Sequence, residues 1–102
     1  MNYQIVLSPG ANEDFSSIVL WYLNIDPELA SRFIMEVDAG SQRIKRMPYA
    51  FPVYSGAFRR ARLKRFPYRI YYFVLRNVVK IEAIFHERRS DLAWITRAND
   101  RR

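Results

Sequence analysis

Cysteine is absent from the 102-residue chain, and histidine occurs once, as His86. The absence of cysteine excludes a disulfide framework, a thiolate zinc site, an iron–sulfur cluster and a cysteine nucleophile, and one histidine is too few for a multi-histidine metal site. We therefore expect no metal and no other cofactor. The chain also lacks an apolar run near the roughly 18 residues of a membrane span, and it lacks a secretory signal pattern. These absences favour a cytoplasmic protein.

The composition is that of a folded protein. Apolar residues make up 50% of the chain and aromatic residues 16%, far above the composition at which chains stay disordered. This length suits one small domain with a single core. We therefore expect one domain over residues 1–102.

Charge is distributed unevenly along the chain. Residues 1–42 contain one base and six acids, a net charge of −5, whereas residues 43–102 contain 16 bases and four acids, a net charge of +12. A basic half on a folded domain attracts a polyanion, either nucleic acid or an acidic protein segment; a well-solvated surface is the simpler alternative. The bases lie in segments that resemble strands rather than in a tail, which favours a binding surface.

The first half of the chain predicts a strand followed by two helices. Residues 2–7 alternate in polarity and predict a short strand. Ser8-Pro9 and Asp26-Pro27 each place an N-cap side chain before a proline at the first helical position. The apolar residues that follow recur at helical spacing, which predicts one helix to about Leu23 and a second that ends before Pro48. The short connection between them predicts an antiparallel helical hairpin.

The second half predicts an antiparallel sheet. Residues 48–56 contain two prolines and a glycine and predict a loop. Three strands are expected at 58–65, 68–75 and 78–86, joined by two-residue turns at Phe66-Pro67 and at Arg76-Asn77. The predicted class is therefore α+β: a strand, a helical hairpin, three further antiparallel strands, and a short C-terminal helix over 87–95.

Two-residue turns fix a register that pairs Ile70 with Leu63 and Ala83, and Tyr72 with Ala61 and Ile81. One face of the sheet then packs on the helices and is almost wholly apolar: Ala61, Leu63, Tyr68, Ile70, Tyr72, Val74, Val79, Ile81, Ala83 and Phe85. The opposite, exposed face collects Arg60, Arg62, Lys64, Arg69, Tyr71, Phe73, Lys80, Glu82, Ile84 and His86. Bases interleaved with aromatic rings suit phosphate contacts with base stacking, or an amphipathic acidic partner.

Three strings occur in fixed order along these elements: LSPGANEDFSSIVLWY (7–22), LKRFPYRIYYF (63–73), and FHERR (85–89) followed by Trp94. Together with the order of elements, they resemble the RelE/ParE superfamily of small toxins from bacterial type II toxin–antitoxin pairs. The closer likeness is to the ParE branch, in which Lys-Arg-Phe-Pro-Tyr and His-x-Arg-Arg before a tryptophan are typical. The resemblance implies a toxin–antitoxin hetero-oligomer. The basic charge of residues 43–102 and the apolar groups on the same surface lead us to expect an antitoxin that contributes an acidic, amphipathic segment.

Resemblance to the ParE branch implies a toxin that acts on DNA gyrase and carries no catalytic residues of its own. Charge then points to a set of residues that contact the antitoxin or the target: Arg60, Arg62, Lys64, Arg69, Tyr71, Phe73, Arg88 and Arg89.

Resemblance to the RelE branch implies the alternative, a ribosome-dependent endoribonuclease that cleaves mRNA without a metal. Lys64 and Arg69 then correspond to charge stabilisers and His86 to the general base or acid. The predicted register places Arg69 and His86 on one face. The terminal tyrosine that this branch uses is missing, which favours the gyrase inhibitor. Glu87, which follows His86, is a candidate substitute for that tyrosine. A module that has lost its toxicity is a third interpretation.

Overall fold

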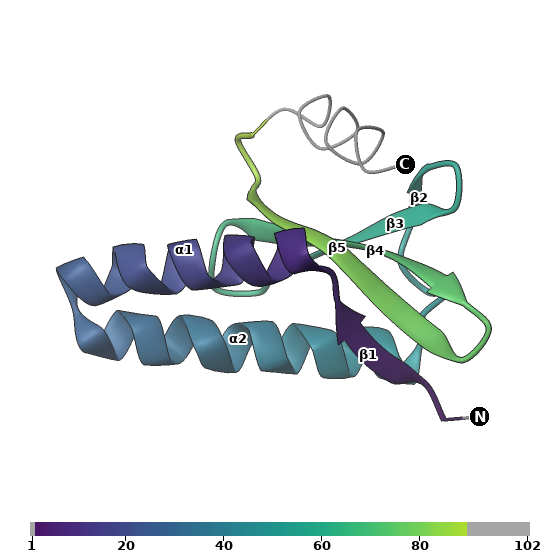
Figure 1. Ribbon diagram of the computed structural model, residues 1–102, viewed down its shortest axis with the longest axis horizontal. Helices are drawn as coiled ribbons and strands as arrows, with labels where there is room; N and C mark the ends of the chain where they lie inside the picture. Colours follow the sequence, from purple (N-terminus) through teal and green to yellow (C-terminus); the bar gives the residue numbers. More distant parts are fainter. Residues whose placement is uncertain (1, 90–102) are drawn as a thin grey trace.

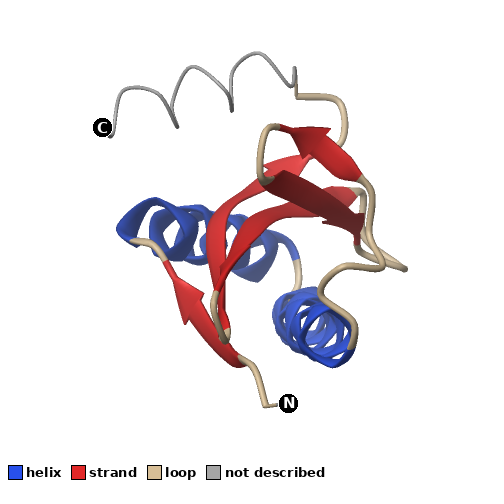
Figure 2. Cartoon of the chain, turned by 90° about the vertical axis from the view of Figure 1, so that its right-hand side faces the viewer, coloured by secondary structure: helices blue, strands red, loops and turns tan. Residues whose placement is uncertain are grey.

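The computed structural model describes residues 2–89, which form an α+β fold of two helices and a five-stranded sheet (Figure 1). In chain order the elements are β1 (Gln4–Leu7), α1 (Pro9–Ile25), α2 (Pro27–Arg46), β2 (Val53–Ser55), β3 (Phe58–Arg62), β4 (Tyr68–Leu75) and β5 (Val78–His86). The strand order is β1-β5-β4-β3-β2, with β1 parallel to β5 and the other pairs antiparallel. The sheet twists strongly across its width (Figure 2). The α+β prediction is confirmed.

Asp26 separates the two helices and caps both of them. Its backbone N–H donates to the Tyr22 carbonyl in the last turn of α1 (2.8 Å), and its carboxylate accepts from the Glu28 N–H in the first turn of α2 (3.0 Å). Because Asp26 closes the last turn, α1 extends to Ile25 rather than ending at Leu23 as predicted. The predicted antiparallel hairpin is confirmed, and one residue determines both of its inner ends.

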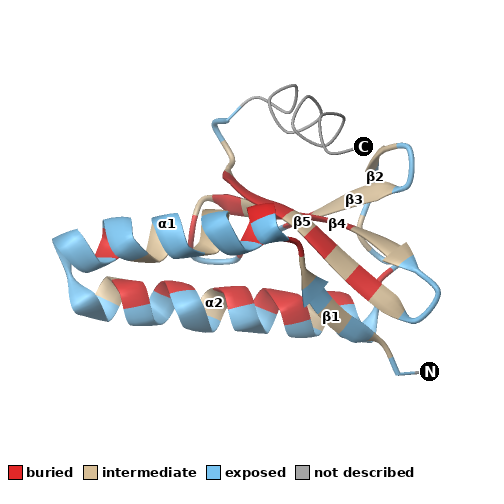
Figure 3. Cartoon of the chain, in the orientation of Figure 1, coloured by how far each residue is buried: buried red, intermediate tan, exposed pale blue. Residues whose placement is uncertain are grey.

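The main core lies between the helical hairpin and one face of the sheet. Phe33 of α2 is fully buried at its centre, with its ring 5.4 Å from the rings of both Phe66 and Tyr68. The helices contribute a buried stripe that includes Val37 and Ile44, and buried positions alternate with partly exposed ones along β5 from Val78 to Glu82 (Figure 3). The amphipathic pattern of the helices therefore predicted this half of the core correctly.

Two connections differ from the sequence prediction. The segment predicted as a loop contains β2, a short edge strand that begins just after Pro52, where proline often stands because it cannot donate to the ladder. The predicted turn at Phe66-Pro67 is a longer connection, and Ala61 therefore pairs with Ile70 rather than with Tyr72. Phe66 does not turn the chain because its ring is buried against the two helices.

The register of β5 changes at Glu82, which has no partner residue on β4. Tyr72 pairs with Ile81 as predicted, but Ile70 pairs with Ile84 instead of Ala83. An additional residue in one strand forms a β-bulge and moves every later side chain to the opposite face. Ile84 accordingly lies in the main core, not on the exposed face as predicted.

The bulge also creates a second, smaller core on the other face of the sheet. Ala83 and Phe85, predicted to pack on the helices, are buried there beside Tyr71, and Tyr54 and Phe58 pack against them. Residues 87–89 form a turn, and the rest of the predicted C-terminal helix lies outside the described residues.

We expect Phe33→Ala to lower the free energy of unfolding by about 3–5 kcal/mol, because the change opens a cavity among four aromatic rings. Chemical denaturation followed by circular dichroism measures this loss. Met35→Ala, on the exposed side of the same helix, is the control and should change it by less than about 0.5 kcal/mol. Equal effects of the two changes would contradict the position of the core.

We expect Asp14→Ala to cost about 1–3 kcal/mol of stability, because the Asp14 carboxylate accepts a hydrogen bond from the Ile84 N–H (3.0 Å) and alanine leaves that donor without it. Asp14→Asn retains an acceptor oxygen and should recover most of the loss. Glu13→Ala, at the neighbouring exposed position, is the control in the same denaturation experiment. An asparagine variant as unstable as the alanine variant would show that the acceptor does not matter.

Candidate functional site

The described residues contain no group of three or more histidine, cysteine or acidic side chains that could hold a metal ion. Within the same part of the chain, neither helix is long and apolar enough to cross a membrane. The candidate site is therefore the set of basic and aromatic residues that the sequence assigned to one exposed face. The structure divides this set among three environments.

Tyr71 belongs to the second core. Its side chain is 1% exposed, and its ring lies 5.9 Å from Tyr54 and 6.0 Å from Phe85. The prediction that Tyr71 is exposed is therefore wrong, because the bulge moves Phe85 beside it and the β2–β3 hairpin contributes Tyr54 and Phe58. Phe73, one step along the same face, is half-buried with its ring 5.4 Å from Phe58.

Several bases on this side contact groups within the chain. The guanidinium of half-buried Arg60 lies 4.6 Å from the centroid of the Tyr54 ring, and that of Arg89 lies 3.9 Å from the centroid of the Phe85 ring. These are cation–π contacts between bases and the rings of the second core. Arg89 is nevertheless exposed as a residue, so its charge remains available at the surface.

Arg62 forms an ion pair with Glu87. Its Nε donates to the Glu87 carboxylate at 2.7 Å, and the Glu87 backbone N–H donates to the Pro67 carbonyl at 2.8 Å. The hydrogen bond from Arg62 lowers the pKa of the Glu87 carboxyl, and the charges of Arg62, Arg69 and His86 lower it further. Glu87 is thus a weak proton acceptor, which makes it a poor substitute for the missing tyrosine.

Arg69 and His86 lie on opposite faces of the sheet. Arg69 pairs across the strands with Phe85 of the second core, whereas His86 pairs with Tyr68 of the main core, and the two rings of that pair are 5.2 Å apart. Directly paired residues project from the same face of a sheet. The expectation that Arg69 and His86 share a face is therefore wrong, and the bulge at Glu82 is the reason.

His86 is held at the end of β5 by its surroundings. Its Nδ1 accepts a hydrogen bond from the Arg88 N–H at 3.0 Å, and its carbonyl accepts one from the Arg89 N–H at 2.8 Å. The neighbouring Tyr68 is a poor proton donor, because burial, together with interactions with Tyr22, raises its pKa to about 12. The geometry is that of a residue that anchors a turn.

The exposed bases lie around these cores rather than on one flat face. Lys64 and Arg65 are exposed in the β3–β4 connection, and Arg88 is exposed beyond β5. Guanidinium and ammonium groups at such positions bind carboxylates or phosphates. They can bind an acidic segment or a nucleic acid, but they do not surround a common reaction centre.

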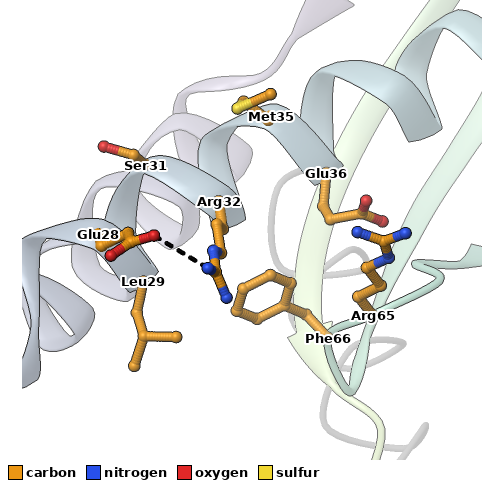
Figure 4. Close-up of a pocket in the computed structure, with 8 residues that line it drawn as sticks. All are labelled: Glu28, Leu29, Ser31, Arg32, Met35, Glu36, Arg65 and Phe66. Carbon is orange, nitrogen blue, oxygen red and sulfur yellow. Dashed lines mark hydrogen bonds and ion pairs between the residues drawn. The ribbon is translucent and has the colours of Figure 1, made fainter.

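An open groove, which the sequence did not predict, lies between α2 and the β3–β4 connection (Figure 4). Its lining residues are Glu28, Leu29, Ser31, Arg32, Met35, Glu36, Arg65 and Phe66. Arg32 pairs with Glu28 at 2.9 Å, whereas Glu36 Oε1 is buried without a hydrogen-bond partner among the described residues. The signal available in the sequence was Met35, an apolar residue that lies on α2 close to polar Ser31 and Arg32.

Comparisons with known proteins agree with this architecture. The family model described as "ParE toxin of type II toxin-antitoxin system, parDE" matches residues 5–91. One similar solved structure is titled "Chromosomal ParDE TA system from P. aeruginosa"; its TM-score is 0.73, at 17% sequence identity over 82% of this chain and 95% of that chain. At this identity the similarity concerns the fold alone. None of the curated proteins compared with the chain matches it. Because the family model covers most of its length, the chain belongs to the ParE toxin family of type II toxin–antitoxin systems.

Proposed function

We propose that the chain is a growth-inhibiting toxin that binds DNA gyrase in the bacterial cytoplasm and that a cognate antitoxin neutralises it. Membership of the ParE family implies the antitoxin partner. The resemblance of the sequence to the ParE branch supports gyrase as the target. The protein acts by binding, with no catalytic residues and no cofactor.

The observation that carries this proposal is the separation of Arg69 from His86. A metal-independent ribonuclease needs a proton acceptor, a proton donor and cations around one phosphate. Here Arg69 pairs with Phe85 on one face, and His86 pairs with Tyr68 on the other. The ribosome-dependent endoribonuclease is therefore the weaker alternative, with Lys64, Arg69 and His86 as its candidate residues.

The target contact is best sought among exposed cations that do not support the fold. Arg88 is exposed, and its backbone N–H donates to Nδ1 of His86. Arg89 is less suitable for a test because its guanidinium packs on Phe85. Arg88 therefore allows a charge to be changed without disturbing the second core.

We expect His86→Gln to preserve both the fold and toxicity, because glutamine can also accept the hydrogen bond from the Arg88 N–H.

Arg88→Glu should weaken gyrase inhibition by about 10-fold, since it reverses a charge at the contact surface. Arg76→Glu, in the exposed β4–β5 turn, is the matched control. Growth inhibition on expression and accumulation of cleaved DNA by purified gyrase measure the three variants. Loss of toxicity and of mRNA cleavage in a folded His86→Gln variant would overturn the proposal in favour of the ribonuclease.

We expect association with the antitoxin to slow by about 10-fold or more between low salt and 0.5 M salt. The physical reason is that the basic half of the chain attracts the acidic antitoxin segment over long range, and salt screens this attraction. Stopped-flow fluorescence of the full toxin with the antitoxin measures the rate. A rate independent of salt would contradict electrostatic recruitment of the antitoxin.

A further inference from the structure

The groove beside α2 contains both apolar surface and charged groups, and we call it the α2 groove (Figure 4). On α2 its lining extends from Glu28 to Glu36, two turns of the helix or about 12 Å, and Arg65 and Phe66 form the other wall. Phe66 is 8% exposed, whereas Met35 is 69% exposed. A methionine side chain adapts its shape to the surface that it contacts, which suits the wall of a binding groove.

Glu36 contributes an unsatisfied hydrogen-bond acceptor to the α2 groove. Its Oε1 is buried and has no hydrogen-bond partner among the described residues. Buried polar groups in native proteins are almost always hydrogen-bonded, because a buried acceptor without a donor lowers the stability of the fold. Glu36 therefore marks a position at which a donor from a second molecule is favourable.

Arg65 contributes an exposed cation to the same groove. Its side chain and that of Glu36 extend from opposite walls, and no ion pair joins these two described residues, although their charges are opposite (Figure 4). Glu28 and Arg32, in contrast, form an ion pair at 2.9 Å. The α2 groove therefore presents one acceptor and one cation that can each bind a group of a partner.

We propose that the α2 groove binds an amphipathic helix of the antitoxin, an inference that rests on the proposed function. The apolar stripe of this helix packs on Met35 and Phe66, in the way that amphipathic helices occupy apolar grooves. On one side of the stripe a lysine or arginine donates to Glu36, and on the other side an acidic side chain pairs with Arg65.

Charge complementarity favours the antitoxin as the occupant. Residues 39–81, which include the whole β3–β4 connection, contain no acidic residue, and Lys64 is exposed beside Arg65 in this connection. This wall of the α2 groove therefore attracts the acidic segment that the antitoxin contributes. A toxin that is stored in complex with its antitoxin can also retain an acceptor that is satisfied only in the complex.

The first test is Glu36→Met, which keeps an unbranched side chain and removes the carboxylate. The melting temperature of the free variant should be unchanged or higher, because no unsatisfied acceptor is buried. The dissociation constant for the purified cognate antitoxin should instead rise about 10-fold or more, because the donor of the antitoxin loses its acceptor. Isothermal titration calorimetry measures this constant. Asp38→Met, at an exposed position of α2 outside the α2 groove, is the matched control and should leave it unchanged.

The second test is Arg65→Glu, compared with Lys45→Glu in the same titration. Lys45 is exposed in the last turn of α2 and does not line the α2 groove. Both changes alter the net charge equally, so both weaken the long-range attraction of the antitoxin. We expect Arg65→Glu to raise the dissociation constant about 10-fold more than Lys45→Glu, because it also removes a direct ion pair.

The third test measures whether the antitoxin covers the groove, and the absence of native cysteine makes it possible. Met35→Cys should react with a maleimide at least about 10-fold more slowly in the complex than in the free toxin, because the apolar stripe covers residue 35. Leu75→Cys, at an exposed position at the end of β4, is the control for a general loss of access and should react equally in both states.

The proposal would be overturned by a folded Glu36→Met variant that binds the antitoxin as tightly as the parent, by equal effects of Arg65→Glu and Lys45→Glu, or by equal reactivity of Met35→Cys in both states. Variants that keep their affinity for the antitoxin but no longer inhibit gyrase would assign the α2 groove to the target instead. A parent chain that binds no antitoxin would overturn the proposed function as well. Thermal melting shows that each variant is folded.

Discussion

Residues at the start of α1 form hydrogen bonds with the edge of β5 that β1 does not cover. The arrangement of the two faces of the sheet depends on this contact. β1 pairs with β5 only as far as Ile81, so the backbone groups of β5 beyond this residue have no strand partner on that side. The Ser8 N–H donates to the Ile81 carbonyl, the Ser8 hydroxyl donates to the Glu82 carbonyl, and the Asp14 carboxylate accepts from the Ile84 N–H. Because buried backbone groups need partners, these bonds hold β5 in its bulged register.

The bulge at Glu82 determines which chemistry the surface can support. Beyond it, Ile84 and His86 face the helices, while Phe85 faces away and is buried beside Tyr71. Arg69 and His86 are therefore separated by the thickness of the sheet. In this register the two residues do not converge on one side of the sheet, which is the arrangement that the ribonuclease alternative requires of them.

The net charge of +12 on residues 43–102 is larger than the charge that is free to bind a partner. Arg60 and Arg89 pack on aromatic rings, and Arg62 forms an ion pair with Glu87. Other bases of this half, among them Lys64, Arg76 and Arg88, are exposed. In the described part of the chain, some basic residues thus support the second core, and others remain exposed at the surface.

The sequence by itself determined the helical hairpin, the order of the elements apart from β2, the α+β class and the similarity to the ParE branch, because caps and apolar periodicity are local signals. Tertiary structure alone decided the register of β5, the second core and the separation of Arg69 from His86. A bulge depends on hydrogen bonds between residues about 70 positions apart, such as Asp14 and Ile84, and a two-residue period is inverted by one additional residue. Nothing in the local pattern at Glu82 shows that a distant helix will satisfy the backbone there.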